Sequence, residues 1–180
     1  MSRLEALAKP LLVPLMDGQS KIEELSASES AIIAKWTTKT AYMHSLTSPL
    51  KQPVVSDHVR ALNGDDGVPL SEVAVFGMLS DFKKQTGYFL ARYWPTFGRR
   101  VRIPIEVAQV SYKIGLQFRH LYLLVAFWPE SALFTIASGL HIPVFPPGRP
   151  WAKYSGEFVI GNGPVDQLAL FSRALGLYFE

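Results

Sequence analysis

The sequence predicts an α+β fold in which residues 1–70 are mainly helical, and residues 71–180 form a mainly antiparallel sheet of four or five strands with a C-terminal helix. Two observations lead to this prediction. Before residue 70, two capping-box patterns each precede apolar residues at helical spacing. After it, aromatic and β-branched residues occur in short extended runs separated by turns. Helices that precede the strands, rather than alternating with them, favour an α+β protein.

The first predicted helix begins at Ser2, which forms a capping-box pattern with Glu5. Pro10 lies where the helical hydrogen bonds should be established, so we expect a kink or an end near it. The apolar face of this helix carries Leu4, Leu7, Ala8 and Leu11. If the helix normally packs on an upstream domain that the chain lacks, its leucines would be exposed and could drive homo-oligomerisation.

Ser26 and Glu29 repeat the capping pattern before a longer predicted helix, which ends near Ser48 because a proline follows. Its apolar stripe consists of Ile32, Ile33, Trp36, Thr40, Met43 and Leu46. Such a stripe normally faces the core. A short helix over 56–62, with Asp57 in its first turn, completes the helical part.

Four extended runs follow, at 73–78, 87–94, 108–118 and 121–128, and their short separations favour antiparallel pairing. Residues 143–150 form a proline-rich connection. After a short strand near Phe158, a Gly-Asn-Gly-Pro turn at 161–164 leads into the predicted C-terminal helix. One face of that helix would carry Leu168, Phe171 and Leu175.

The composition limits the class of protein. With 180 residues, 48% hydrophobic and 18% charged, the chain suits one domain with a buried core. It has no cysteine, which excludes disulfide frameworks, zinc fingers, iron–sulfur clusters and thiol nucleophiles. No histidine spacing suggests a shared metal, and we expect neither metal nor cofactor. The charged amino terminus lacks a secretory pattern, which together with the absent cysteines favours the cytoplasm.

The most apolar stretch, 120–148, does not predict a membrane-spanning helix. Such a helix needs about 20 consecutive apolar residues, whereas four prolines, a glutamate and a glycine interrupt this stretch between 129 and 147. Strands covered on both faces also read as continuous apolar runs. We therefore expect buried strands here and no membrane.

Positive charge is concentrated in the second half of the chain. Residues 1–90 carry nine basic and ten acidic side chains, a net of −1, whereas residues 91–180 carry nine and five, a net of +4. Between Lys83 and Arg119 there are eight basic side chains and one acidic side chain, interleaved with aromatic residues. Arginines pair with phosphates and exposed rings stack on unpaired bases, so this segment is typical of a nucleic-acid surface. The candidate binding residues are Arg92, Tyr93, Trp94, Arg99, Arg100 and Arg102.

Three other interpretations remain open. The arginines could form an ordinary solvated sheet face. The aromatic residues Trp94, Phe97, Phe145 and Trp151 could anchor a protein partner, as in an interaction or inhibitory module without nucleic-acid contact. His44, His58 and Lys39 could build a small hydrolase-like site, provided that the fold brings them within hydrogen-bond reach. Each of these polar residues also has a local structural explanation, which disfavours an enzyme.

Met1 to Met16 contains a Ser-x-Leu-Glu pattern, and Ile33 to Ala41 contains Trp-x-x-Lys-Thr-Ala. These two segments resemble a family of poorly characterised bacterial proteins related to HNH endonucleases. In that family a cysteine-bearing HNH-like module ends just before a stretch similar to residues 1–10 here. The resemblance implies a relative of the downstream domain, in a phage, mobile-element or defence context. No catalytic residue of the nuclease module has a counterpart in this chain.

The sequence as a whole therefore predicts a non-catalytic binding module whose basic, aromatic surface contacts nucleic acid or a nucleoprotein partner.

Overall fold

The computed structural model describes residues 2–47, 56–63, 73–91, 112–127, 134–137, 142–145 and 176–179. Its helical elements are α1 (Arg3–Met16), the 3₁₀ turn η1 (Ile22–Glu24), α2 (Ala27–Thr47) and α3 (Ser56–Leu62). Its strands are β1 (Val73–Ala91), β2 (Tyr112–Phe127), β3 (Phe134–Ala137), β4 (Ile142–Phe145) and β5 (Gly176–Phe179). Helices precede strands throughout this part of the chain, which confirms the α+β class.

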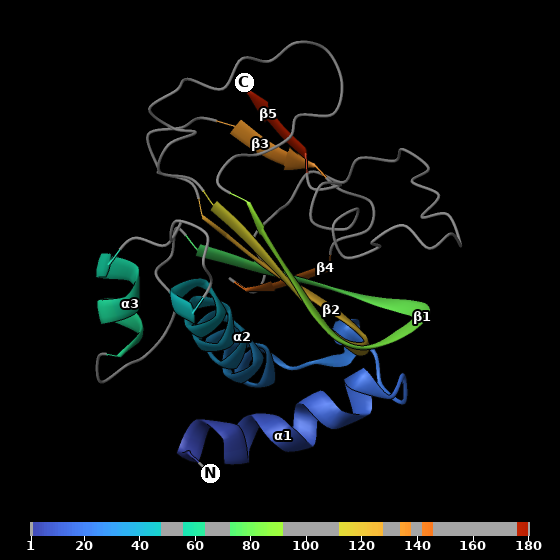
Figure 1. The fold of residues 1–180 in the computed structure, drawn as a ribbon. Helices are drawn as coiled ribbons and strands as arrows, with labels where there is room; N and C mark the ends of the chain where they lie inside the picture. The colour runs from blue at the N-terminus through green and yellow to red at the C-terminus, as the bar shows by residue number, and fades with distance from the viewer. Residues whose placement is uncertain are drawn as a thin grey trace.

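The strands form two antiparallel sheets, one of three strands in the order β2-β1-β4 and one in which β3 pairs with β5. Figure 1 shows α1 and α2 on one side of the three-stranded sheet and the β3–β5 pair beyond its other side. Antiparallel pairing is as predicted. The predicted C-terminal helix and the strand near Phe158 lie outside the described residues.

Both predicted capping boxes are present. The Ser2 amide donates to the Glu5 carboxylate at 2.8 Å, and the Glu5 amide donates to the Ser2 hydroxyl at 3.3 Å. Ser26 and Glu29 exchange the same two bonds ahead of α2. These bonds satisfy amide groups that a helix cannot pair internally, and they fix the start of both helices where the sequence predicts it.

Of the kink or end expected near Pro10, the end is wrong, because the helix continues through Pro10 and Pro14 to Met16. Pro10 is exposed and Pro14 is half-buried. Ala8, Leu12 and Leu15 are buried against the core. This packing holds the helix together although each proline removes one backbone hydrogen bond. Of the predicted apolar face, Leu7 is exposed whereas Leu4 and Leu11 are half-buried.

The described parts of the four predicted extended runs belong to two long, bent strands, β1 and β2. Val73 to Leu79 pairs with Leu121 to Phe127, and Lys84 to Ala91 pairs with Lys113 to Arg119. The register shifts once between these two stretches and once more between Lys84 and Gly87, so β1 carries extra residues opposite β2. Bulges bend a strand pair, and Figure 1 shows β1 and β2 turning together at this place.

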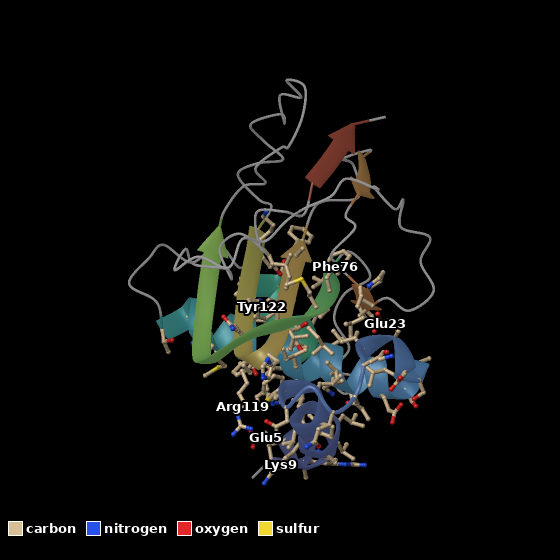
Figure 2. All side chains as sticks on the ribbon, turned by 90° about the vertical axis from the view of Figure 1, so that its right-hand side faces the viewer. Glu5, Lys9, Glu23, Phe76, Arg119 and Tyr122 are labelled. Atoms are coloured by element: carbon tan, nitrogen blue, oxygen red, sulfur yellow. The ribbon has the colours of Figure 1, made fainter. Side chains whose placement is uncertain are left out.

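The three-stranded sheet is buried on both faces where β1 and β2 first pair. On one face, Val75, Leu123 and Val125 pack with α1 and α2 in the main core. On the other face, Phe76 and Tyr122, labelled in Figure 2, are also buried. Residues 121–127, the described start of the apolar stretch after His120, are thus a strand covered on both sides, as predicted. No helix within the described ranges is long and apolar enough to cross a membrane.

The face of α2 that packs on the sheet is not the predicted apolar stripe. Its buried residues are Ser30, Ile33, Ala34, Thr37, Thr38, Ala41, Tyr42 and Ser45, most of them small. Of the predicted stripe, Ile33 is buried, Ile32, Trp36 and Thr40 are half-buried, and Met43 and Leu46 are exposed. Small side chains let the helix lie close to the sheet, and the larger apolar residues are left at its side.

Candidate binding surfaces

The six predicted nucleic-acid residues, Arg92, Tyr93, Trp94, Arg99, Arg100 and Arg102, all lie outside the described residues, in the 92–111 connection between β1 and β2. The structure does describe the two strand ends that flank this connection. Ala91 pairs with Lys113 across the β1–β2 ladder. The connection therefore leaves and re-enters the sheet at the same end of one strand pair, which is a common site for binding loops on a rigid scaffold.

Two of the eight basic residues counted in this region do not offer free positive charge. Lys113 is fully buried. Arg119 forms an ion pair with Asp17, which follows α1. Figure 2 shows Arg119 at the bend of β1 and β2, on the side where α1 lies. The other six basic residues that could form a basic surface in this region are Lys83, Lys84, Arg92, Arg99, Arg100 and Arg102.

Arg119 has a backbone φ of 53°, in the left-handed region that residues other than glycine rarely adopt. Its carbonyl accepts a hydrogen bond of 3.0 Å from the Gln117 side-chain amide. A hollow of about 500 Å³ lies between the loop after α1 and the bend of the sheet, and Asp17, the ion-pair partner of Arg119, is part of its lining. The residues that line this hollow are Asp17, Gly18, Gln19, Ser20, Lys21, Glu24, Leu79 and His120.

Lys39 and His44 of the predicted hydrolase-like site line one open hollow of about 360 Å³ on α2, together with Glu5 of α1. His58 does not line it; its ring is buried and contacts Phe127 edge to face, with ring centres 4.2 Å apart. The three side chains therefore do not share this hollow.

His58 instead belongs to a buried network that the sequence did not indicate. Its Nδ1 lies 2.9 Å from the Tyr112 hydroxyl, which lies 2.6 Å from the Tyr42 hydroxyl. The three side chains come from α3, β2 and α2, so the network joins three elements. A buried tyrosine hydroxyl needs a hydrogen-bond partner, and each of these two has one.

Burial shifts the pKa of every group in this network in the direction that favours its neutral form. Desolvation lowers the pKa of His58 below its ordinary value of 6.5, against the opposing attraction of Asp57. Desolvation raises the pKa of Tyr42 to about 12 and that of Tyr112 well above 10. All three side chains are thus neutral near pH 7, and their hydrogen bonds tie the elements together rather than activate a nucleophile.

The prediction that Phe145 anchors a protein partner is wrong, because this residue packs in the main core. Trp94, Phe97 and Trp151 lie outside the described residues. Within the described ranges, no three His, Asp or Glu side chains gather where they could hold a metal ion. Comparison of the chain with protein-family models, curated proteins and solved structures finds no match.

Proposed function

We propose that this chain is a non-catalytic binding module that acts in the cytoplasm and contacts nucleic acid or a nucleoprotein through residues 92–111. The observation that supports this proposal is the pairing of Ala91 with Lys113, which anchors both ends of that segment on one strand pair. The segment carries four arginines against one glutamate, with Tyr93, Trp94 and Phe97 between them. Arginine supplies phosphate contacts and aromatic rings supply stacking on unpaired bases.

The resemblance to HNH-related proteins adds a context. A companion of a nuclease, encoded by a phage or mobile element or used in defence against one, would meet nucleic acid in its ordinary work. This context rests on the two sequence segments alone.

The experiment is a fluorescence anisotropy titration of the purified chain against labelled single-stranded and double-stranded DNA and RNA, at several salt concentrations. Affinity that falls steeply with salt supports phosphate contacts, because each contact releases condensed counterions. Tighter binding to single strands supports stacking by the aromatic residues. Absence of binding at low salt would reject the proposal and favour the alternative, a protein-interaction module without nucleic-acid contact.

A further inference from the structure

The helix α3 is held in place by few contacts. Figure 1 shows it at the edge of the structure, beside α2. Of its seven residues, His58 and Leu62 are buried and Val59 is half-buried. An ion pair of α3, between Asp57 and Arg60, joins two residues of this helix and not two elements. A helix this short is not stable alone in water, and an element with few buried contacts can open before the rest of a protein. The docking of α3 therefore depends strongly on His58 and Leu62.

The surroundings of His58 suit a neutral ring. The side chain is 6% exposed. Its Nδ1 lies 2.9 Å from the Tyr112 hydroxyl, and its ring meets Phe127 edge to face. A neutral imidazole can donate a hydrogen bond to that hydroxyl or accept one from it. A hydrogen bond and ring packing thus hold His58 against β2, and neither of them requires a charge.

The groups around His58 offer little compensation for a positive charge on the ring. The hydroxyls of Tyr112 in β2 and Tyr42 in α2 stay protonated, because burial raises the pKa of both. Asp57 attracts the charge, but its carboxylate is 70% exposed and pairs with Arg60 at 2.9 Å. Solvent screens such an exposed carboxylate. Desolvation therefore prevails, and the pKa of His58 lies below its ordinary value.

We propose that α3 is a pH-sensitive switch, which is docked on α2 and β2 near neutral pH and is released in mild acid, when His58 takes up a proton, while the β1–β2 sheet stays folded. Release returns the charged ring to water. The sheet keeps its core in the released form, because Val75 and Leu123 belong to the cluster that includes residues of α1 and α2. The proposal goes beyond nucleic-acid binding and does not depend on it.

The size of the effect follows from proton linkage. In released α3 the pKa of His58 should be near 6.5, as in an unfolded chain, and in docked α3 it is lower. Between these two values, each fall of one pH unit raises the ratio of released to docked α3 by at most about tenfold. From about pH 7.5 to about pH 5.5 this ratio should rise severalfold, with an upper limit of about tenfold.

The test is hydrogen exchange of the full chain, measured by mass spectrometry at these two pH values, with each rate divided by the intrinsic exchange rate at that pH. Peptides that cover α3 report its docking, and peptides from residues 73–79 and 121–127 report the sheet. The variant His58→Gln keeps a hydrogen-bonding side chain that does not titrate. The matched control is His44→Gln, which removes a histidine that lines the hollow on α2.

In the unmodified chain and in His44→Gln, the protection of α3 should fall severalfold on acidification while the sheet stays protected. In His58→Gln the protection of α3 should be the same at both pH values. If His58→Gln releases α3 at both, NMR of the unmodified chain decides. The His58 ring signals and the α3 amide signals should then change with one common midpoint, below pH 6.5.

Several results would overturn the proposal. Protection of α3 that does not change with pH would do so, as would an equal change in His58→Gln or the loss of the change in His44→Gln. If α3 and the sheet lose protection together, acid unfolds the whole protein and α3 is not a separate switch. A His58 ring that titrates while the α3 amide signals stay constant would also contradict it.

Discussion

The hydroxyls of Tyr42 and Tyr112 lie 2.6 Å apart in the core, although 70 positions separate them in the sequence. Tyr112 also meets Nδ1 of His58 at 2.9 Å, so it is the central member of the network. Because α3 is only seven residues long, it depends on packing for its stability. The network is one of the contacts that hold α3 on β2.

Replacement of Tyr112 by Phe should destabilise the protein by about 1–3 kcal/mol, because it leaves two buried polar groups without this partner. Tyr42→Phe should cost less, since Tyr112 would keep its bond to His58. Urea denaturation of both single variants and the double variant gives the coupling between the hydroxyls. Equal losses from the two single variants would argue against a central role for Tyr112.

The pH dependence of stability should report on His58. Its folded pKa lies below 6.5, so the unfolded chain binds its proton more readily. The stabilisation is therefore fully present above about pH 6.5 and is lost as the pH falls below it, with a slope of at most about 1.4 kcal/mol per pH unit. His58→Gln removes this titration but keeps a hydrogen-bonding side chain. Urea denaturation at pH 7, 6 and 5 should show that the free energy of unfolding falls more steeply with decreasing pH for the unmodified chain than for His58→Gln. If the two proteins lose stability in parallel, the His58 ring is not buried in its neutral form.

Thr37 and Thr38 form a matched pair on the buried face of α2. Both are fully buried, but the Thr37 hydroxyl donates to the Ile33 carbonyl at 2.7 Å, whereas the Thr38 hydroxyl has no hydrogen-bond partner among the described residues. Thr38→Val should stabilise the protein by about 1 kcal/mol, because valine has the same shape without the unsatisfied hydroxyl. Thr37→Val should be neutral or mildly destabilising. Thermal unfolding of the two variants checks the difference, and a drop in melting temperature for Thr38→Val would contradict it.

Local signals in the sequence predicted the elements well where local physics decides them. The capping boxes at Ser2 and Ser26 place the starts of two helices, and the limits of α3 are as predicted. The sequence left open whether α1 kinks or ends at Pro10, because the outcome depends on packing of Leu12 and Leu15, which outweighs a lost hydrogen bond. The four extended runs join in pairs into β1 and β2 because bulges keep the strands paired across the bend, and the sequence does not indicate where these bulges lie.

The candidate sites were less predictable. The sequence predicts that the apolar stripe of α2 faces the core. In the structure the sheet packs instead on the face of α2 that carries small residues such as Ala34 and Ala41. The network around Tyr112 depends on contacts over 54 and 70 positions, which periodicity cannot show. One available signal was a tyrosine at the start of a buried strand, since such a hydroxyl requires a partner.

Two substitutions of Arg119 should differ in their effect on stability. Its left-handed φ of 53° suits glycine, and its ion pair with Asp17 is partly solvent-exposed and contributes at most about 1 kcal/mol. Arg119→Ala removes the ion pair and keeps the strain, so it should destabilise the protein by about 1 kcal/mol. Arg119→Gly relieves the strain and should be near neutral. If denaturation shows equal losses for both, the strain at this position is not significant.

The basic connection gives the sharpest functional prediction. Replacing Arg99, Arg100 and Arg102 by Ala should weaken nucleic-acid binding and reduce the slope of log affinity against log salt, by about 0.9 for each phosphate of duplex DNA that an arginine no longer neutralises. Tm should hardly change, because substitutions of charged residues in a connection usually alter stability by less than about 0.5 kcal/mol.

The control replaces Arg3, Lys9 and Lys21, three exposed cations of the amino-terminal part, and it lowers the net charge of +3 by the same amount. Anisotropy titrations at several salt concentrations compare the two triple variants. If both reduce the slope equally, overall charge rather than residues 92–111 governs binding; if neither does, the arginines do not contact phosphate.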